Sequence, residues 1–266
     1  MEYSTLLVTR EDGVTKVVLN RPEVYNAFND ELTYELQDLL RKEARGGECR
    51  CLVIRGAGDK AFCSGQDVKN LGEKWADPEF VPHFRQDLIR RYHPVIEQLA
   101  DFPAPTLAAV NGVAAGAGLS LALACDLRIA APHAQFIEVF IRVGLVPDSG
   151  SSWFLPRIVG LSRALEMCLT GRPVSAEEAL EMGLVNQVTG EDDFDQVVDE
   201  RARFLATLPT YACVKIRKLL HQSLQNGLAE QLDLESYYQE LAGHTEDHRE
   251  GVMAFLEKRQ AKFVGR

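Results

Sequence analysis

The sequence predicts an α/β fold, in which a sheet with crossover helices is followed by a helical C-terminal region. Over the first half of the 266 residues, short apolar and β-branched runs alternate with helix-like segments. This alternation is typical of parallel strands, because each parallel connection needs a crossover, usually a helix. From about residue 193 onward every segment has a helical pattern. We therefore expect a core at 1–199 and a helical region at 200–266.

The first elements are two strands, a helix and a buried strand. Residues 5–10 and 14–20 are β-branched runs on either side of a turn. Asn29 is placed to cap a helix at 30–44. Four leucines share one face of that helix, namely Leu32, Leu36, Leu39 and Leu40. The run at 50–56 is apolar in its centre, as in a strand that is buried on both faces.

The later elements continue the alternation and then become helical. They are a helix near 80–100, a strand at 106–110, a helix of small residues at 116–125 and strands at 126–131 and 184–188. Ser175 and Glu178 have the spacing of a capping box. The last four segments are amphipathic and have more apolar surface than one small bundle hides. We expect them to pack on the core or on another subunit.

Composition and charge exclude several classes of protein. The formal net charge of -10 argues against binding to nucleic acid. No apolar run approaches the ~20 residues that span a bilayer, and the first residues lack the pattern of a secretory signal. None of the six cysteines forms a C-x-x-C pair, so we expect reduced, mostly buried thiols. These observations predict a cytoplasmic protein with no membrane or nucleic-acid partner.

Two glycine-bearing loops each follow a predicted strand. Gly56, Gly58 and Ala61 match the spacing of the dinucleotide fingerprint, but no helix opens at these glycines. We therefore expect no dinucleotide site there. Gly116 and Gly118 precede the small-residue helix. They indicate either tight packing of that helix or backbone N–H groups that point at a developing negative charge.

The stretch GLVPDSGSS, at 144–152, contains a carboxylate in apolar surroundings. Asp148 is the only charged residue between Arg142 and Arg157. Burying such a group is costly unless it is hydrogen-bonded or used. Together with the two glycine loops, it supplies the groups that stabilise an enolate and move a proton. Ser149 beside it is more typical of a residue that stabilises a turn than of a nucleophile.

Other chemistries have little support in the sequence. No G-x-S-x-G motif of a serine hydrolase occurs. His244 and His248 are four residues apart on a helix face, but glutamates surround them, so we interpret this face as solvated. We therefore expect no metal site.

Six stretches together resemble the crotonase superfamily, the enoyl-CoA hydratases and isomerases. They are LNRPEVYNAFN, AFCSGQDV, NGVAAGAGLSLALACDLRIA, QFIEVFIRVGLVPDSG, GLVNQV and FLEKRQAKF. The resemblance covers nearly the whole chain. It implies a spiral of ββα units, a helical C-terminal region that builds trimers or dimers of trimers, and a CoA thioester as substrate without a tightly bound cofactor.

The resemblance also implies roles for particular residues. The backbone N–H groups of Gln66 and Ala117 would form an oxyanion hole for the thioester carbonyl. The remaining residues expected to bind substrate or CoA are Ala61, Cys63, Ser64, Gly65, Gly116, Phe140, Lys258 and Lys262, of which the lysines would offset the phosphates, from the same or a neighbouring subunit. Arg21 is a weaker candidate for that role. The acyl pocket would be lined by residues such as Trp75, Phe84, Leu88, Phe140 and Trp153.

The sequence departs from the hydratases of this superfamily at their two glutamates. Ser120 and Phe140 occupy those positions, and neither can do acid–base work at neutral pH. Glu138 would share the face of Phe140 on a strand and is a weak substitute. Asp148 remains, where isomerases and dehalogenases of the superfamily carry their working carboxylate. The resemblance therefore implies an acyl-CoA isomerase, most similar to the ring-1,2-epoxyphenylacetyl-CoA isomerases of phenylacetate breakdown. The alternatives are a hydratase, a dehalogenase or thioesterase, and a non-catalytic CoA-binding protein.

Overall fold

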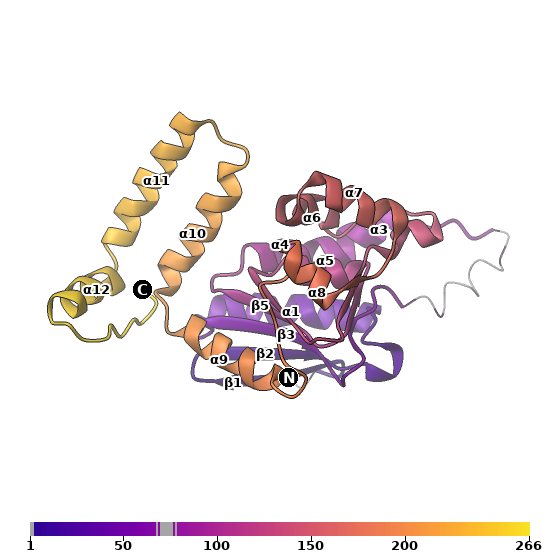
Figure 1. Cartoon of the computed structure of the whole chain (residues 1–266), viewed down its shortest axis with the longest axis horizontal. Coiled ribbons are helices and arrows are strands. Elements are labelled where there is room, and N and C mark those ends of the chain that lie inside the picture. Colours follow the sequence, from indigo (N-terminus) through magenta and orange to yellow (C-terminus); the bar gives the residue numbers. More distant parts are fainter. Residues whose placement is uncertain (1–2, 68, 70–76, 78) are drawn as a thin grey trace.

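The computed structural model describes residues 3–67, 69, 77 and 79–266, and these form two sheets packed with helices. Figure 1 shows the sheets and their helices on one side and a group of C-terminal helices that projects from them. The larger sheet has six strands in the order β1-β2-β3-β5-β7-β10, and the smaller has four in the order β4-β6-β8-β9. This confirms the predicted α/β class.

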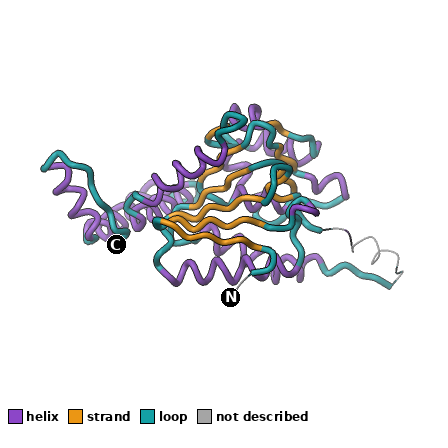
Figure 2. Tube along the Cα trace, turned by 90° about the horizontal axis from the view of Figure 1, so that it is seen from below, coloured by secondary structure: helices purple, strands orange, loops and turns teal. Residues whose placement is uncertain are grey.

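The larger sheet begins with a hairpin and continues with parallel strands (Figure 2). Its strands are β1 (Leu6–Glu11), β2 (Val14–Leu19), β3 (Cys51–Gly56), β5 (Thr106–Val110), β7 (Leu127–Ala130) and β10 (Gln187–Val188). The central strands β3 and β5 are buried almost throughout, because helices cover both faces of the sheet.

The smaller sheet repeats the path of the larger one. Its strands are β4 (Ala61–Cys63), β6 (Val113–Ala115), β8 (Gln135–Ile137) and β9 (Val174–Ser175). Each of the first three follows a strand of the larger sheet directly, so that β3 leads to β4, β5 to β6 and β7 to β8. Helices then connect these strand pairs. The chain therefore advances in successive ββα units, as the resemblance implied.

Ten helices belong to the core among the described residues, and some of them begin at a side-chain cap or a proline. They are η1 (Pro22–Val24), α1 (Asp30–Gly46), α3 (Phe84–Asp87), η2 (Leu88–Tyr92), α4 (His93–Ala100), α5 (Ala117–Leu123), η3 (Val139–Val143), α6 (Ser151–Val159), α7 (Leu161–Thr170) and α8 (Ala176–Glu181). The Asn29 side chain accepts a hydrogen bond from the N–H of Leu32, and the four leucines of α1 are fully buried. Ser175 caps α8, but the carboxylate of Glu178 pairs with Arg172 at 2.5 Å.

The last four helices are α9 (Phe194–Ala206), α10 (Thr210–Ser223), α11 (Leu228–Gly243) and α12 (Glu246–Leu256). Residue 200 lies inside α9, whose apolar face packs against β3 and β5 of the larger sheet. The projecting part therefore begins at α10 (Figure 1). It exposes many large apolar side chains, namely Ile216, Leu220, Leu224, Leu228, Leu232, Tyr237, Val252, Met253, Phe255 and Leu256.

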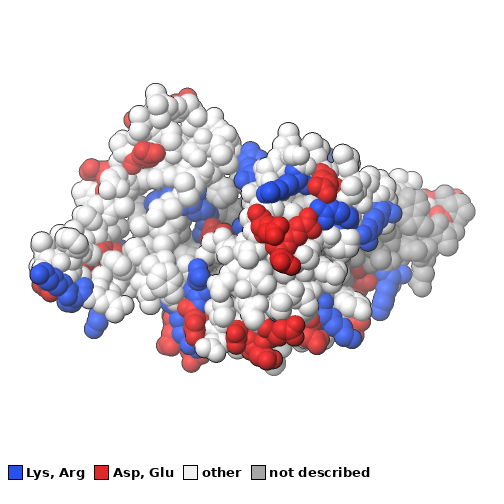
Figure 3. Space-filling view, in the orientation of Figure 1, with Lys and Arg blue, Asp and Glu red and all other residues white. Residues whose placement is uncertain are grey.

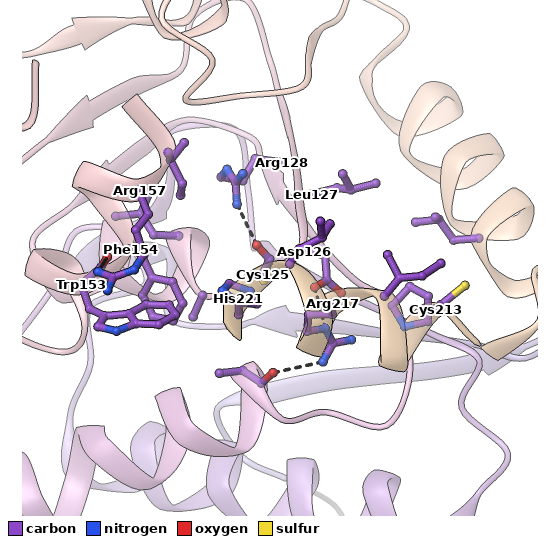
Figure 4. A pocket seen from close by; sticks show the side chains of 18 of the residues that line it. Cys125, Asp126, Leu127, Arg128, Trp153, Phe154, Arg157, Cys213, Arg217 and His221 are labelled. Carbon is purple, nitrogen blue, oxygen red and sulfur yellow. Dashed lines mark hydrogen bonds and ion pairs between the residues drawn. The ribbon is translucent and has the colours of Figure 1, made fainter. Parts of the chain in front are cut away.

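One buried arginine holds α10 against the core (Figure 4). The guanidinium of Arg217 donates to the carbonyls of Ala100, Phe102 and Ala104 and pairs with Asp126 at 2.7 Å. An apolar groove of about 380 Å³ lies between α10 and α6. Across the described residues, no helix is both long enough and apolar enough to cross a membrane.

Candidate active site

The two glycine loops of the sequence meet at one point in the structure. Gly65 has a φ of 93°, and a Cβ there would lie 2.9 Å from the Ala115 carbonyl oxygen and 3.6 Å from the Ala117 nitrogen. A Cβ at Gly118 would lie only 2.1 Å from the Cys63 carbonyl oxygen. The loops at 63–66 and 115–118 are therefore in direct contact, and the packing role considered for Gly118 is confirmed.

Two backbone N–H groups remain free at this contact. The surrounding backbone is hydrogen-bonded, since Phe28 donates to Gly65 at 2.7 Å and Gly116 donates to Ile137 at 3.0 Å. For the N–H groups of Gln66 and Ala117, by contrast, the described part of the chain contains no acceptor. Ala117 is buried and Gln66 is exposed, so the two donors lie where the site opens to solvent, and both can bind an oxygen atom of a ligand.

Asp148 lies in a tight turn immediately before α6. Ser149 and Gly150 both have left-handed backbone conformations, with φ of 51° and 85°. The hydroxyl of Ser149 donates to the Asp148 carboxylate at 2.8 Å. Ser149 therefore supports the turn and the carboxylate, as its sequence context indicated. Burial raises the pKa of Asp148, while the hydrogen bond from Ser149 and the charge of His93 oppose this rise.

Ser120 joins the Asp148 turn to the glycine turn. Its buried hydroxyl lies 3.1 Å from the Asp148 carbonyl oxygen and 3.2 Å from that of Gly116. Phe140 is also buried, and a Cβ at Gly116 would lie 3.7 Å from its ring. Both residues thus lie at the site, where they shape and connect its turns.

The position of Glu138 differs from the expectation. Strand β8 ends at Ile137, and Glu138 stands at the N-terminal end of η3, so the alternation of a strand does not apply to it. Its side chain is fully buried, and the hydroxyl of Ser151 donates to Oε1. Burial raises the pKa of Glu138 to about 7; the hydrogen bond from Ser151 opposes this rise and the charge of Asp148 adds to it.

Tyr92 is a residue of the site that the sequence analysis missed. It is the last residue of η2, a π-helical turn, and such turns are frequent at functional sites. Its hydroxyl donates to Oε1 of Gln66 at 3.2 Å. Burial raises the pKa of Tyr92, and the charge of Asp148 contributes to the rise. Nothing in the local sequence, LIRRYHPV, marks Tyr92 as a residue of the site.

Within one chain, the basic residues that were expected to bind the CoA phosphates do not lie beside the two free N–H groups and Asp148. Lys258 and Lys262 follow α12, which Figure 1 places at the far end of the C-terminal region from α5. Figure 3 shows basic side chains at that outer end. Arg21 forms an ion pair with Asp67 at 2.9 Å and donates to the Ala27 carbonyl, so it is engaged within the loop that precedes the site.

The apolar candidates for the acyl pocket lie in different parts of the structure. Trp75 lies outside the described residues. Phe84 begins α3 and is partly exposed, and Leu88 begins η2 and packs against the core. Trp153 lies in the groove beneath α10, where its ring stacks on His221 with the centroids 5.3 Å apart (Figure 4).

Several motifs of the sequence lie outside the candidate site. No helix follows Gly56 and Gly58 directly; the chain continues into β4. His244 bonds with Glu240 at 2.9 Å on an exposed surface. No group of three or more His, Cys, Asp or Glu side chains is placed to hold a metal ion, as far as the described residues extend. All six cysteines are free, and four are buried.

Comparison with known proteins gives the same family over almost the whole chain. Residues 9–266 match the family model for enoyl-CoA hydratase/isomerase. The chain is 44% identical over 256 residues to 1,2-epoxyphenylacetyl-CoA isomerase from Escherichia coli K12, covering 96% of this chain and 97% of that protein. It is 43% identical to a probable enoyl-CoA hydratase from Rhodobacter capsulatus, with both chains covered in full.

A solved structure agrees with this result. The crystal structure of a putative enoyl-CoA hydratase from Streptomyces coelicolor A3(2) superposes with a TM-score of 0.92 at 38% identity, covering 100% of this chain and 96% of that one. The family match at residues 9–266 spans both glycine loops and the Asp148 turn. The chain belongs to the enoyl-CoA hydratase/isomerase family, the crotonase superfamily.

Proposed function

We propose that this protein is an acyl-CoA isomerase that moves a proton, and with it a double bond, next to a CoA thioester. The observation that carries the proposal is the arrangement of one carboxylate and two free N–H groups. The hydroxyl of Ser120 lies within hydrogen-bond distance of the backbone carbonyl oxygens of Asp148 and Gly116. Ala117, which supplies one of the two N–H groups, directly follows Gly116 in the chain. Such donors stabilise the oxyanion of an enolate most effectively when they are fixed in advance.

The reaction needs only one group that takes and returns a proton. The thioester oxygen accepts hydrogen bonds from the N–H groups of Gln66 and Ala117. Asp148 removes a proton from C2 of a 3-enoyl-CoA, and the electron pair of the broken C–H bond moves into the enolate. The same proton then bonds to C4, the double bond shifts to C2–C3, and Asp148 is again a carboxylate. Its raised pKa favours this exchange, because desolvation makes a carboxylate a stronger base.

Two substrate classes fit this chemistry. One is the unsaturated acyl-CoA of fatty acid metabolism. The other is a ring epoxide such as 1,2-epoxyphenylacetyl-CoA, an intermediate of phenylacetate catabolism, in which enolate formation at the carbon beside the ring accompanies opening of the epoxide. The 44% identity to an isomerase of that name supports the second class. Hydration is less well supported, because Ser120 and Phe140 supply no acid or base to position and split a water.

Binding of CoA would use the loop before the site and a neighbouring chain. Backbone groups at Ala61, Cys63, Ser64 and Gly65 would contact the adenine end. Lys258 and Lys262 would contact the phosphates of the CoA that is bound to an adjacent subunit. The assembly would be a cytoplasmic homotrimer or dimer of trimers. The exposed apolar residues of α10, α11 and α12, including Phe255 at 83% exposure, support such an assembly. Sedimentation equilibrium tests it, and a stable monomer at micromolar concentration contradicts it.

The decisive experiment replaces Asp148 by asparagine, which keeps the shape and removes the base. We expect D148N to lower the rate of 3-enoyl-CoA isomerisation by roughly 10²–10⁴-fold. Calorimetric affinity for an acyl-CoA should stay nearly unchanged, because both N–H donors belong to the backbone. The matched control is D101N, at an exposed aspartate before β5, which should keep full activity. A D148N enzyme that retains a third of the rate contradicts the proposal.

A further inference from the structure

Glu138 is a buried carboxyl group for which the proposed reaction has no use. Its side chain is fully buried, and its Oε2 atom has no hydrogen-bond partner within the described residues. Leaving such an oxygen unpaired costs free energy, so a residue chosen for packing alone would be apolar. Carboxyl groups of this kind, buried beside a site, are candidates for a role in it.

The contacts of Glu138 lead to both halves of the candidate site. The hydroxyl of Ser151 donates a hydrogen bond to the carboxyl group of Glu138, and the backbone N–H of Ser151 donates one to the Asp148 carbonyl oxygen at 2.9 Å. On the other side, the residue before Glu138 in the chain, Ile137, accepts the N–H of Gly116 at 3.0 Å. Glu138 therefore stands between the turn that carries Asp148 and the turn that carries Ala117.

The charges around Glu138 oppose its ionisation. Two ionisable groups face it, namely the Asp148 carboxylate from the turn before α6 and the Cys168 thiol from α7. No basic group in the described part of the chain contributes to its electrostatics. The negative charge of Asp148 disfavours a second negative charge on Glu138 in this desolvated site, while the charge of His93 opposes the rise in the pKa of Asp148 that burial causes. Burial and the charge of Asp148 raise the pKa of Glu138 to about 7, so Glu138 holds its proton below that pH and loses it above.

We propose that Glu138 is a positioning residue for Asp148: through Ser151 it fixes the turn that carries Asp148, and in its protonated form it adds no second negative charge to the site. This inference rests on the role proposed for Asp148 above. Once Glu138 ionises, the second negative charge raises the proton affinity of Asp148. Asp148 then holds the proton that it has removed, and the return of that proton to the substrate slows.

The test compares the pH dependence of kcat in the wild type, E138Q and E138L. The wild type should lose activity as the pH rises through about 7. E138Q keeps the shape and the hydrogen bond to Ser151 but stays neutral, so its rate should remain level there and should match the wild type below that pH. E138L removes the bond and should lower kcat at least ~10-fold, with KM little changed, because a displaced base is a poor one. E97Q, at an exposed glutamate of α4, is the matched control and should follow the wild type.

The outcomes separate this inference from the proposed function. Superposed pH profiles of wild type and E138Q overturn the role of Glu138, while an inactive D148N enzyme leaves the isomerase proposal standing. E138L with wild-type kcat overturns the positioning role in the same way. Should E138L fail to fold, the E138Q profile alone decides. An active D148N enzyme instead refutes the proposed function itself.

Discussion

Replacing Glu138 by glutamine should change how the stability of the folded protein depends on pH. The pKa of Glu138 is raised from its ordinary value of 4.5 to about 7, chiefly because the carboxyl is buried. A difference of one in pKa between folded and unfolded states corresponds to about 1.4 kcal/mol, so ionising Glu138 in the folded protein costs about 3 kcal/mol.

The sign of the effect follows from proton binding. Below about pH 4.5 both states hold the proton, and burial of Glu138 carries no ionisation penalty. Between about pH 4.5 and about pH 7 the folded protein still holds a proton that the unfolded chain has lost, so the free energy of unfolding falls as the pH rises. Above about pH 7 the loss is complete. Asp148, whose pKa is also raised, adds a smaller effect of the same sign in both wild type and variant.

Urea unfolding of wild type and E138Q at several values from about pH 5 to about pH 8 measures this directly. The protein concentration must be fixed, because association changes the apparent stability. E138Q should gain on the wild type by about 2.5 kcal/mol across this window, mostly below about pH 7, above which the difference should level off. A constant difference between the two proteins over the whole window would show that Glu138 does not titrate there, and would refute the reasoning.

Two further substitutions test the geometry of the site. G118A should lower the free energy of unfolding, measured with heat or urea, by more than about 3 kcal/mol, because the new Cβ would lie 2.1 Å from the Cys63 carbonyl oxygen. A variant with wild-type stability would contradict the close contact between the two loops. The Tyr92 hydroxyl orients the Gln66 side chain, so Y92F should lower kcat/KM several-fold, as expected from the ~1 kcal/mol of one hydrogen bond. Calorimetry should show unchanged affinity for CoA. Equal kinetics of Y92F and the wild type would remove Tyr92 from the site.

Local patterns in the sequence were sufficient for most of the elements. The leucines of α1 repeat with the helical period, and Asn29 precedes them at the cap, so both the helix and its buried face could be predicted. The motifs around Gly65, Gly116 and Asp148 also identified the parts of the candidate site. What these signals share is their range, since each is set by residues a few positions apart along the chain.

Tertiary contacts decided how the site is connected. Glu138 was expected on a strand, but β8 ends one residue earlier and the chain turns into η3, so its carboxyl is directed at Ser151 and not along the face of Phe140. Tyr92 reaches Gln66 from a helix 26 positions away. The sequence by itself determined which residue types are present and which helices and strands they favour. Only the packing of separate segments decided which polar groups lose water and which partner each one meets, because desolvation and hydrogen bonding depend on distance in space and not on distance along the chain.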